Sequence, residues 1–352
     1  MRRLLPLLAL LAAALGCADG YPHLKAGEPI PAVALAPPAG PARAERVVLI
    51  SIDGLRPDAI EAAKAENLQK LIERGAWGAH VETIRPSVTL PSHTAMLTGL
   101  DFQRHGVVWN NYRSGYIPVP TVFSVAAQAK KSSAMLFSKD KFHFIANPAC
   151  VSWVYGNPIP NKIPEREDYL DPVQLQKMIK RDEEWEKKPV SSKPSLQRPG
   201  DLMTTAEMLA RAFSESYALG KWPVTFIHFR EPDENGHRYG WMGPQYLQGI
   251  REVDKALATV VAAIEKNGGF EKIALIISAD HGGSVRGHYR VKEPDRAENV
   301  RIPWICVGPR VPAGLKIDRP LRTFDTMPTA LAFLGLGAPE GIDGKAVAEV
   351  LR

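Results

Sequence analysis

The stretch Val47-Val48-Leu49-Ile50-Ser51-Ile52-Asp53-Gly54 decides the fold class of this 352-residue chain. It is a short run, almost entirely apolar and rich in β-branched residues, and the Asp-Gly pair directly after it is a turn signal. Such a run is typical of a strand that is buried on both faces of a parallel sheet. Because similar runs alternate with helix-like stretches down the chain, the sequence predicts an α/β fold.

The alternation continues to the C-terminus. We expect strands at residues 47–52, 133–137, 224–229, 273–278 and 302–307. We expect helices at residues 57–74, 91–97, 121–130, 201–219, 244–266 and 326–334. The pattern predicts one domain over residues 45–352, in which the periodicity fails at about 156–200 and indicates a surface insertion.

The N-terminus predicts export from the cytoplasm. Arg2 and Arg3 precede an apolar run of signal-peptide length, so residues 1–18 are expected to be a signal peptide of a periplasmic or secreted protein. The run is too short for a convincing membrane-spanning helix. Residues 14–17 loosely resemble a lipoprotein signal, which leaves two outcomes open: a lipid anchor at Cys17, or ordinary cleavage nearby. Residues 19–44 are expected to be a flexible linker, since 36–44 are rich in Pro, Ala and Gly.

The composition excludes some classes of protein. The net charge of +6 comes from scattered basic residues, and no nucleic-acid-binding module is evident. Two cysteines beyond Cys17 are too few for a disulfide framework, and Cys306 is expected to be a buried thiol.

Three aspartates follow expected strands: Asp53, Asp233 and Asp280. An isolated aspartate at such a position is more often a turn or cap residue. In an open α/β sheet, however, the loops after parallel strands line one crevice, so the three can converge. The nearby histidines are His237, His281 and His288, and carboxylates with imidazoles suit divalent metals, zinc above all, with manganese or iron left open.

These motifs resemble the alkaline phosphatase superfamily, and within it the nucleotide pyrophosphatase/phosphodiesterase branch. The resemblance is carried, in the family's order, by the stretches Ser51-Ile52-Asp53-Gly54-Leu55-Arg56, Pro86-Ser87-Val88-Thr89-Leu90-Pro91-Ser92-His93, His105-Gly106-Val107-Val108-Trp109-Asn110, Pro232-Asp233-Glu234-Asn235-Gly236-His237 and Ala279-Asp280-His281-Gly282. It implies a three-layer α/β/α sandwich with a mixed, largely parallel central sheet.

The resemblance also implies roles for single residues. Asp53, Asp280 and His281 would hold one of two divalent metal ions, and Asp233, His237 and His288 the other. Thr89 would lie between the metals as nucleophile, and Asn110 would donate a hydrogen bond to a nonbridging oxygen of a small phosphate-ester substrate. One departure concerns His288, because the eukaryotic enzymes carry their last histidine far downstream, whereas this chain has none after His288.

The predicted function is a metal-dependent phosphodiesterase or nucleotide pyrophosphatase that acts through a phospho-threonine intermediate. Phosphomonoesterase or phosphonate hydrolase activity on the same fold stays open, and so does a non-catalytic exported binding protein. A simpler role for Thr89 is a helix cap, since Pro91 starts a helical stretch. The remaining histidines, among them His93 and His228, are expected to be structural.

Overall fold

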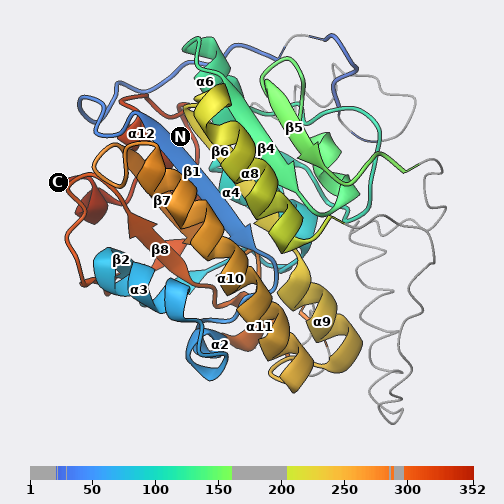
Figure 1. Ribbon diagram of the computed structural model, residues 1–352. Helices are drawn as coiled ribbons and strands as arrows, with labels where there is room; N and C mark the ends of the chain where they lie inside the picture. Colours follow the sequence, from blue (N-terminus) through green and yellow to red (C-terminus); the bar gives the residue numbers. More distant parts are fainter. Residues whose placement is uncertain (1–20, 22, 29, 161–203, 285–286, 289–296) are drawn as a thin grey trace, which may run out of the picture.

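The computed structural model describes residues 21, 23–28, 30–160, 204–284, 287–288 and 297–352. Its centre is an eight-stranded mixed sheet in the order β5-β4-β6-β1-β7-β8-β2-β9 (Figure 1). The strands are β1 (Arg46–Ile52), β2 (Ala76–Gly78), β4 (Ser133–Phe137), β5 (Trp153–Gly156), β6 (Val224–Phe229), β7 (Ile273–Ser278), β8 (Trp304–Val307) and β9 (Leu315–Ile317). Only β8 runs antiparallel to its neighbours, which confirms the predicted largely parallel sheet.

Helices cover the sheet. Figure 1 shows α8, α10 and α3 in front of it, whereas α4 and α12 lie behind. The helices are α2 (Pro57–Ala62), α3 (Glu66–Arg74), α4 (Thr89–Thr98), α5 (Phe102–His105), α6 (Val122–Gln128), α8 (Ala206–Gly220), α9 (Glu231–Tyr239), α10 (Pro244–Lys266), α11 (Ala297–Val300) and α12 (Thr326–Phe333). A separate pair, β3 (Val81–Glu82) and β10 (Leu321–Arg322), completes the strands of the described residues.

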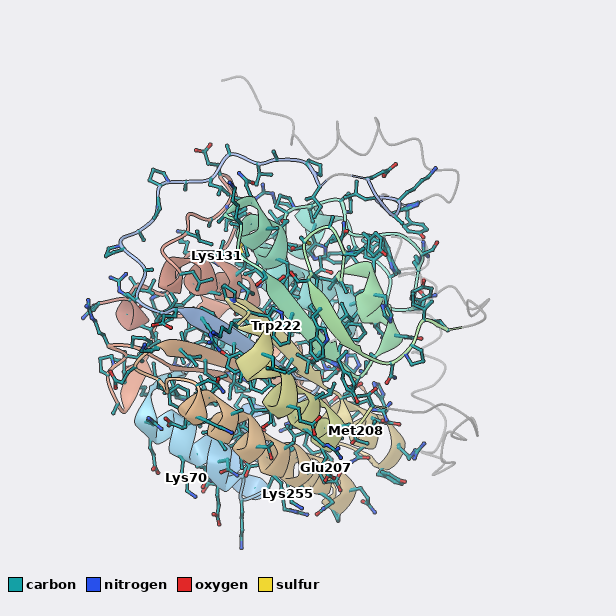
Figure 2. All side chains as sticks on the ribbon, turned by 45° about the horizontal axis from the view of Figure 1, so that its top comes forward. Lys70, Lys131, Glu207, Met208, Trp222 and Lys255 are labelled. Carbon is teal, nitrogen blue, oxygen red and sulfur yellow. The ribbon has the colours of Figure 1, made fainter. Side chains whose placement is uncertain are left out.

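The core lies between the sheet and these helices. Every residue of β6 and β7 is buried, as expected for strands with a helix layer on either face. Helix α10 buries one stripe, which includes Ile250, Leu257 and Ile264, and each such side chain contributes about 1.5–3 kcal/mol by leaving water. Its opposite face is polar: Lys255 on α10 projects outward, as do Lys70 on α3 and Glu207 on α8 (Figure 2).

Several predicted elements differ from the structure. The helix expected at 57–74 is two helices, because Ala63 and Ala65 enter the core and Lys64 between them takes φ +54°. Helix α9 was not predicted, although it carries two of the expected site residues. The expected helix at 201–219 begins at Ala206 in the described residues, where Thr205 caps it by accepting a hydrogen bond from the Met208 N–H.

The described part of residues 19–44 packs on the domain, whereas the sequence predicted a flexible linker there. Leu24 forms a β-bridge with Tyr116, and Leu35 forms one with Pro339. Tyr21 is buried against the Trp109 ring, with ring centroids 5.1 Å apart, and its hydroxyl donates to the Ser114 carbonyl at 2.6 Å. A few spaced apolar residues therefore anchor a stretch whose composition is typical of a linker.

The expected signal peptide, Cys17 and most of the expected insertion lie outside the described residues. Residues on either side of the stretch 161–203 lie together, since the Thr204 N–H donates to Asn157 Oδ1 at 2.8 Å. Cys150 and Cys306 are buried free thiols, and burial raises the pKa of Cys150 to about 12. Among the described helices, none is both long and apolar enough to span a membrane.

Candidate functional site

The site lies where four neighbouring parallel strands, β4, β6, β1 and β7, end at one edge of the sheet. The strands β6, β1 and β7 end at the same height in the sheet, because Ser51 of β1 pairs with both His228 and Ser278. Chain direction therefore places the residues after each strand side by side. They are Lys139 after β4, Asp233 after β6, Asp53 after β1 and Asp280 after β7.

Hydrogen bonds from backbone N–H groups join three of these loops. The Asp233 N–H donates to the Asp53 carbonyl at 3.0 Å, and the Gly54 N–H donates to Asp280 Oδ1 at 3.1 Å. Gly54 takes φ +71°, and a Cβ on it would lie 2.9 Å from the Asp233 Cα. Only glycine satisfies both conditions without strain, which explains Asp-Gly at this strand end.

Asp53, Asp280 and His281 form one group of ligand-type atoms. His281 Nε2 lies 3.4 Å from Asp53 Oδ1 and 3.2 Å from Asp280 Oδ2, and all three side chains are fully buried. The structure therefore brings together the three residues that the resemblance assigned to one metal, in a geometry that could hold a cation.

Asp233, His237 and His288 form a second group beside the first. His237 Nε2 lies 3.2 Å from Asp233 Oδ1 and 3.0 Å from His288 Nε2. His288 Nε2 lies 3.7 Å from Asp233 Oδ1, and the ring stacks on His281 with centroids 3.5 Å apart. His281 Nε2 is also within 3.9 Å of Asp233 Oδ1, so this imidazole stands between the two groups. The side chain of His237 is 45% exposed and lies at the rim.

The residues present fit a pair of divalent metal ions. Four buried atoms of the two groups have no hydrogen-bond partner among the described residues: Asp53 Oδ1, Asp233 Oδ1, Asp280 Oδ2 and His281 Nε2. A buried polar atom without a partner lowers the stability of the fold. These four are carboxylate and imidazole atoms, which are the ligand atoms that zinc binds in proteins. Burial and repulsion from Asp53 raise the pKa of Asp280 well above its usual range, so a cation beside this carboxylate would stabilise its charged form.

Thr89 is the first residue of α4, and the segment around it is tied to both groups. Two residues before it, the Ser87 carbonyl accepts a hydrogen bond from His288 Nδ1 at 2.6 Å. Four residues after it, His93 Nδ1 lies 3.5 Å from Asp280 Oδ2. Val88 occupies the N-cap position, so Thr89 does not cap the helix. The side chain, 2% exposed, stands at a helix N-terminus, which favours bound anions.

Asn110 is bound to the same helix end. Its Oδ1 accepts from the Leu90 N–H at 2.9 Å and from Lys141 Nζ at 3.0 Å. Because the oxygen takes both donors, the amide nitrogen is the group of Asn110 that remains to donate to a ligand. The arrangement suits the hydrogen bond that the resemblance implied.

Lys139 is a residue of the site that the sequence analysis missed. Its Nζ donates to Asp53 Oδ2 at 2.6 Å and to Asp233 Oδ2 at 2.7 Å. Burial and repulsion from Asp233 raise the pKa of Asp53, but Lys139 and His228 outweigh them and hold it below its usual range. The signal was available, because Ser-Lys-Asp-Lys follows a buried strand as the aspartates do.

His228 is a second missed residue, and it supports Asp53 from within β6. Its Nε2 lies 2.9 Å from Asp53 Oδ2 and its Nδ1 lies 3.2 Å from Ser138 Oγ. Burial lowers the pKa of His228 to about 4, so the neutral ring donates from Nε2 and orients the carboxylate. His93 bonds to Ser51 Oγ at 2.7 Å and to the Thr89 carbonyl at 2.8 Å, contacts that position α4.

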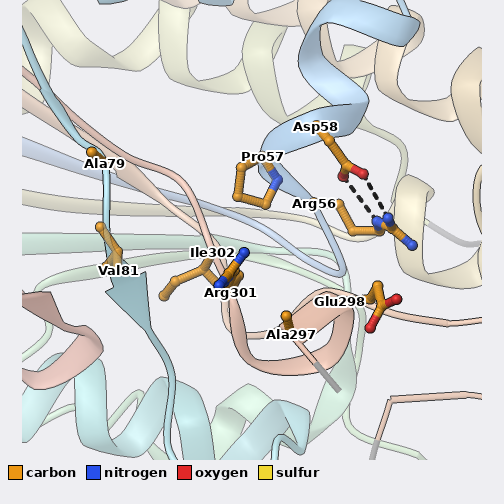
Figure 3. Close-up of a pocket in the computed structure, with 9 residues that line it drawn as sticks. All are labelled: Arg56, Pro57, Asp58, Ala79, Val81, Ala297, Glu298, Arg301 and Ile302. Carbon is orange, nitrogen blue, oxygen red and sulfur yellow. Dashed lines mark hydrogen bonds and ion pairs between the residues drawn. The ribbon is translucent and has the colours of Figure 1, made fainter. Parts of the chain in front are cut away.

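A cavity of about 360 Å³ lies next to this site but contains none of the expected site residues (Figure 3). Arg56 lines the cavity, donates to the Gly283 carbonyl at 3.0 Å and pairs with Asp58 at 2.6 Å.

The chain matches known proteins over most of its length. A family model described as type I phosphodiesterase / nucleotide pyrophosphatase matches residues 47–291. The bis(5'-adenosyl)-triphosphatase enpp4 of Mus musculus is 27% identical over 253 residues, which are 68% of this chain and 47% of the relative. Ectonucleotide pyrophosphatase/phosphodiesterase family member 3 of Bos taurus is 24% identical over 250 residues, or 67% of this chain and 24% of the relative. The chain thus spans about half, or less, of the length of these relatives.

Solved structures share the fold at low sequence identity. Murine ectonucleotide pyrophosphatase / phosphodiesterase 5, solved as an inactive threonine-to-alanine variant in complex with AMP, aligns with a TM-score of 0.59 and 13% identity, covering 83% of this chain and 96% of that one. A phosphonate monoester hydrolase of Agrobacterium radiobacter aligns with a TM-score of 0.58 and 17% identity, covering 87% and 77%. These likenesses confirm the predicted alkaline phosphatase-like fold.

Proposed function

Because this chain belongs to the type I phosphodiesterase / nucleotide pyrophosphatase family, we propose that it hydrolyses small phosphoric diesters with Thr89 as its nucleophile. One observation carries the proposal: Thr89 begins a helix, and Ser87 before it and His93 within it contact the two Asp/His groups. The inactive threonine-to-alanine variant of the murine relative supports a threonine in this role.

Two divalent metal ions are part of the proposal. Asp53, Asp280 and His281 would hold one, and Asp233, His237 and His288 the other, with His281 near both. When bound, zinc ions would supply the positive charge that stabilises the Thr89 alkoxide and the developing charge on the phosphoryl oxygens.

The chain's own residues arrange the substrate. Thr89 Oγ, after losing its proton to solvent, forms a bond to phosphorus as the bond to the leaving oxygen breaks. The Asn110 amide donates to a nonbridging oxygen, and the N-terminus of α4 favours the negative charge there. Water then attacks phosphorus, the Thr89 oxygen leaves and is reprotonated, and the acid product departs.

We expect diesters to be turned over faster than monoesters. A diester carries one fewer negative charge on its phosphoryl group, so it needs less neutralisation from a threonine and asparagine site. The kcat/KM for bis-p-nitrophenyl phosphate and for thymidine monophosphate p-nitrophenyl ester should exceed that for p-nitrophenyl phosphate by about tenfold, which corresponds to roughly 1.4 kcal/mol. Faster turnover of the monoester would overturn the diester preference and leave the nucleophile untouched.

We propose that the protein is exported, on the basis of Arg2, Arg3 and the apolar run after them. In its native host it should fractionate outside the cytoplasm with a new N-terminus between residues 17 and 20. Mass spectrometry of that N-terminus distinguishes a lipidated Cys17 from an unmodified one. A Cys17→Ser variant serves as the control for the lipid, and an intact Met1 in the cytosol would contradict export altogether.

A further inference from the structure

The loop after β4 brings a second lysine to the site. Lys139 and Lys141 flank Asp140 at the start of a 3₁₀ turn (Asp140–Phe144). Lys139 binds the carboxylates of Asp53 and Asp233, whereas Lys141 Nζ reaches Asn110 Oδ1 at 3.0 Å. The two ammonium groups thus contact different parts of the site. That of Lys141 lies beside Asn110, the proposed hydrogen-bond donor to the substrate phosphate.

Three groups meet at that point. Asn110 Oδ1 joins the Lys141 ammonium to the backbone N–H of Leu90, which is the residue after Thr89. Lys141 is therefore hydrogen-bonded directly to the side-chain amide of Asn110, and through that amide it is linked to the N-terminus of α4. The Lys141 ammonium, the Asn110 amide nitrogen and the N-terminus of α4 each carry full or partial positive charge. Together they favour an anion next to Thr89.

Lys141 also lacks a counter-charge. Within the described ranges, its ammonium forms no ion pair with a carboxylate, in contrast to Lys139. The side chain is partly buried, and burial together with repulsion from Lys139 lowers its pKa to about 8. A partly desolvated ammonium that hydrogen-bonds only a neutral amide is well placed to gain an anionic partner.

We propose that Lys141 is a substrate-binding residue that, together with Asn110, contacts a nonbridging phosphoryl oxygen and raises the activity of the site toward phosphate monoesters. This inference rests on the proposed function of Thr89. A monoester phosphoryl group carries up to two negative charges and a diester carries one, so a cation at this place stabilises the monoester more. Lys141 then sets the ratio between the two activities, while the diester remains the better substrate.

The test compares Lys141→Gln with the wild type on p-nitrophenyl phosphate and bis-p-nitrophenyl phosphate. We expect kcat/KM for the monoester to fall about 10- to 100-fold, as for loss of one charged contact, and that for the diester to fall less than about fivefold. Lys141→Arg, which keeps the charge, should recover most of the monoester activity. Lys70→Gln on the exposed face of α3 is the matched control and should change neither rate (Figure 2).

A binding measurement keeps the test independent of turnover. Calorimetry with inorganic phosphate on the metal-loaded proteins should show binding weakened about tenfold or more in Lys141→Gln and unchanged in Lys70→Gln. An equal fall in both kcat/KM values would mean that Lys141 only holds Asn110 in place, and it would overturn the proposal. So would unchanged phosphate affinity. If the wild type turns over neither ester, the proposed hydrolase function fails, and the phosphate affinities alone then decide for or against Lys141.

Discussion

The Thr89→Ala protein should fold and bind metal but lose turnover of every phosphate ester, by about 10⁴-fold or more, as for removal of other catalytic nucleophiles. The reason is that alanine at the first position of α4 has no hydroxyl to attack phosphorus. The cost in stability should be small, because the Thr89 hydroxyl makes no hydrogen bond with the described residues and only a methyl group is also lost.

The measurements are kcat/KM with bis-p-nitrophenyl phosphate, metal content, and the thermal midpoint of unfolding. Thr89→Ser is the matched variant: it keeps the hydroxyl and should keep measurable activity, because the attacking atom is still present. Full activity in Thr89→Ala would disprove the mechanism. Loss of activity accompanied by loss of metal or by a large drop in the midpoint would show that the residue is structural.

Metal removal should have the second large effect. The wild type should bind close to two equivalents of zinc, and chelation should abolish turnover and lower the unfolding midpoint. Asp53, Asp233 and Asp280 are buried together, and Lys139 is the one lysine among the described residues that pairs with them. Each site, at a free zinc concentration a thousand times its dissociation constant, would stabilise the fold by about 4 kcal/mol, and that contribution disappears when the ion is removed.

The His288→Ala variant distinguishes the zinc affinities of the two sites. Loss of one of three protein ligands should weaken zinc binding at the second site by about 10- to 100-fold, while the Asp53, Asp280 and His281 group keeps its ion. Titration calorimetry and metal analysis measure this without any assay of activity. His80→Ala, a substitution of an exposed histidine outside the site, is the control. Unchanged stoichiometry and affinity in His288→Ala would remove His288 from the ligand set.

The central strands and the longest helix could be predicted from the sequence. Strands β4, β6 and β7 and helix α10 have the bounds that were expected, because each has a mainly apolar run or an apolar stripe of its own. The short strands β2 and β9 could not be predicted, since three residues carry no periodicity and their pairing comes from neighbouring strands. Helix α9 holds Pro, Asn and Gly, so its formation depends on tertiary contacts rather than propensity.

The candidate site divides in a similar way. The aspartates and histidines sit in motifs with fixed spacing, so their convergence could be expected from strand direction. Lys139 and Lys141 follow a buried strand as the aspartates do, but they and His228 belong to no motif of fixed spacing. Which residues they contact depends on the sheet order that puts β4 next to β6 and β6 next to β1. That order is set by packing across the whole chain, which no local pattern records.

The contacts of Tyr21 and Leu24 matter for how this protein is truncated for expression. Tyr21 lies four residues after Cys17, yet it packs on Trp109, the residue directly before Asn110. A recombinant form that starts at Glu45 keeps the whole sheet but uncovers Trp109 and loses the bridge from Leu24 to Tyr116. The domain boundary that matters for handling the protein therefore lies ahead of Tyr21 rather than at the first strand.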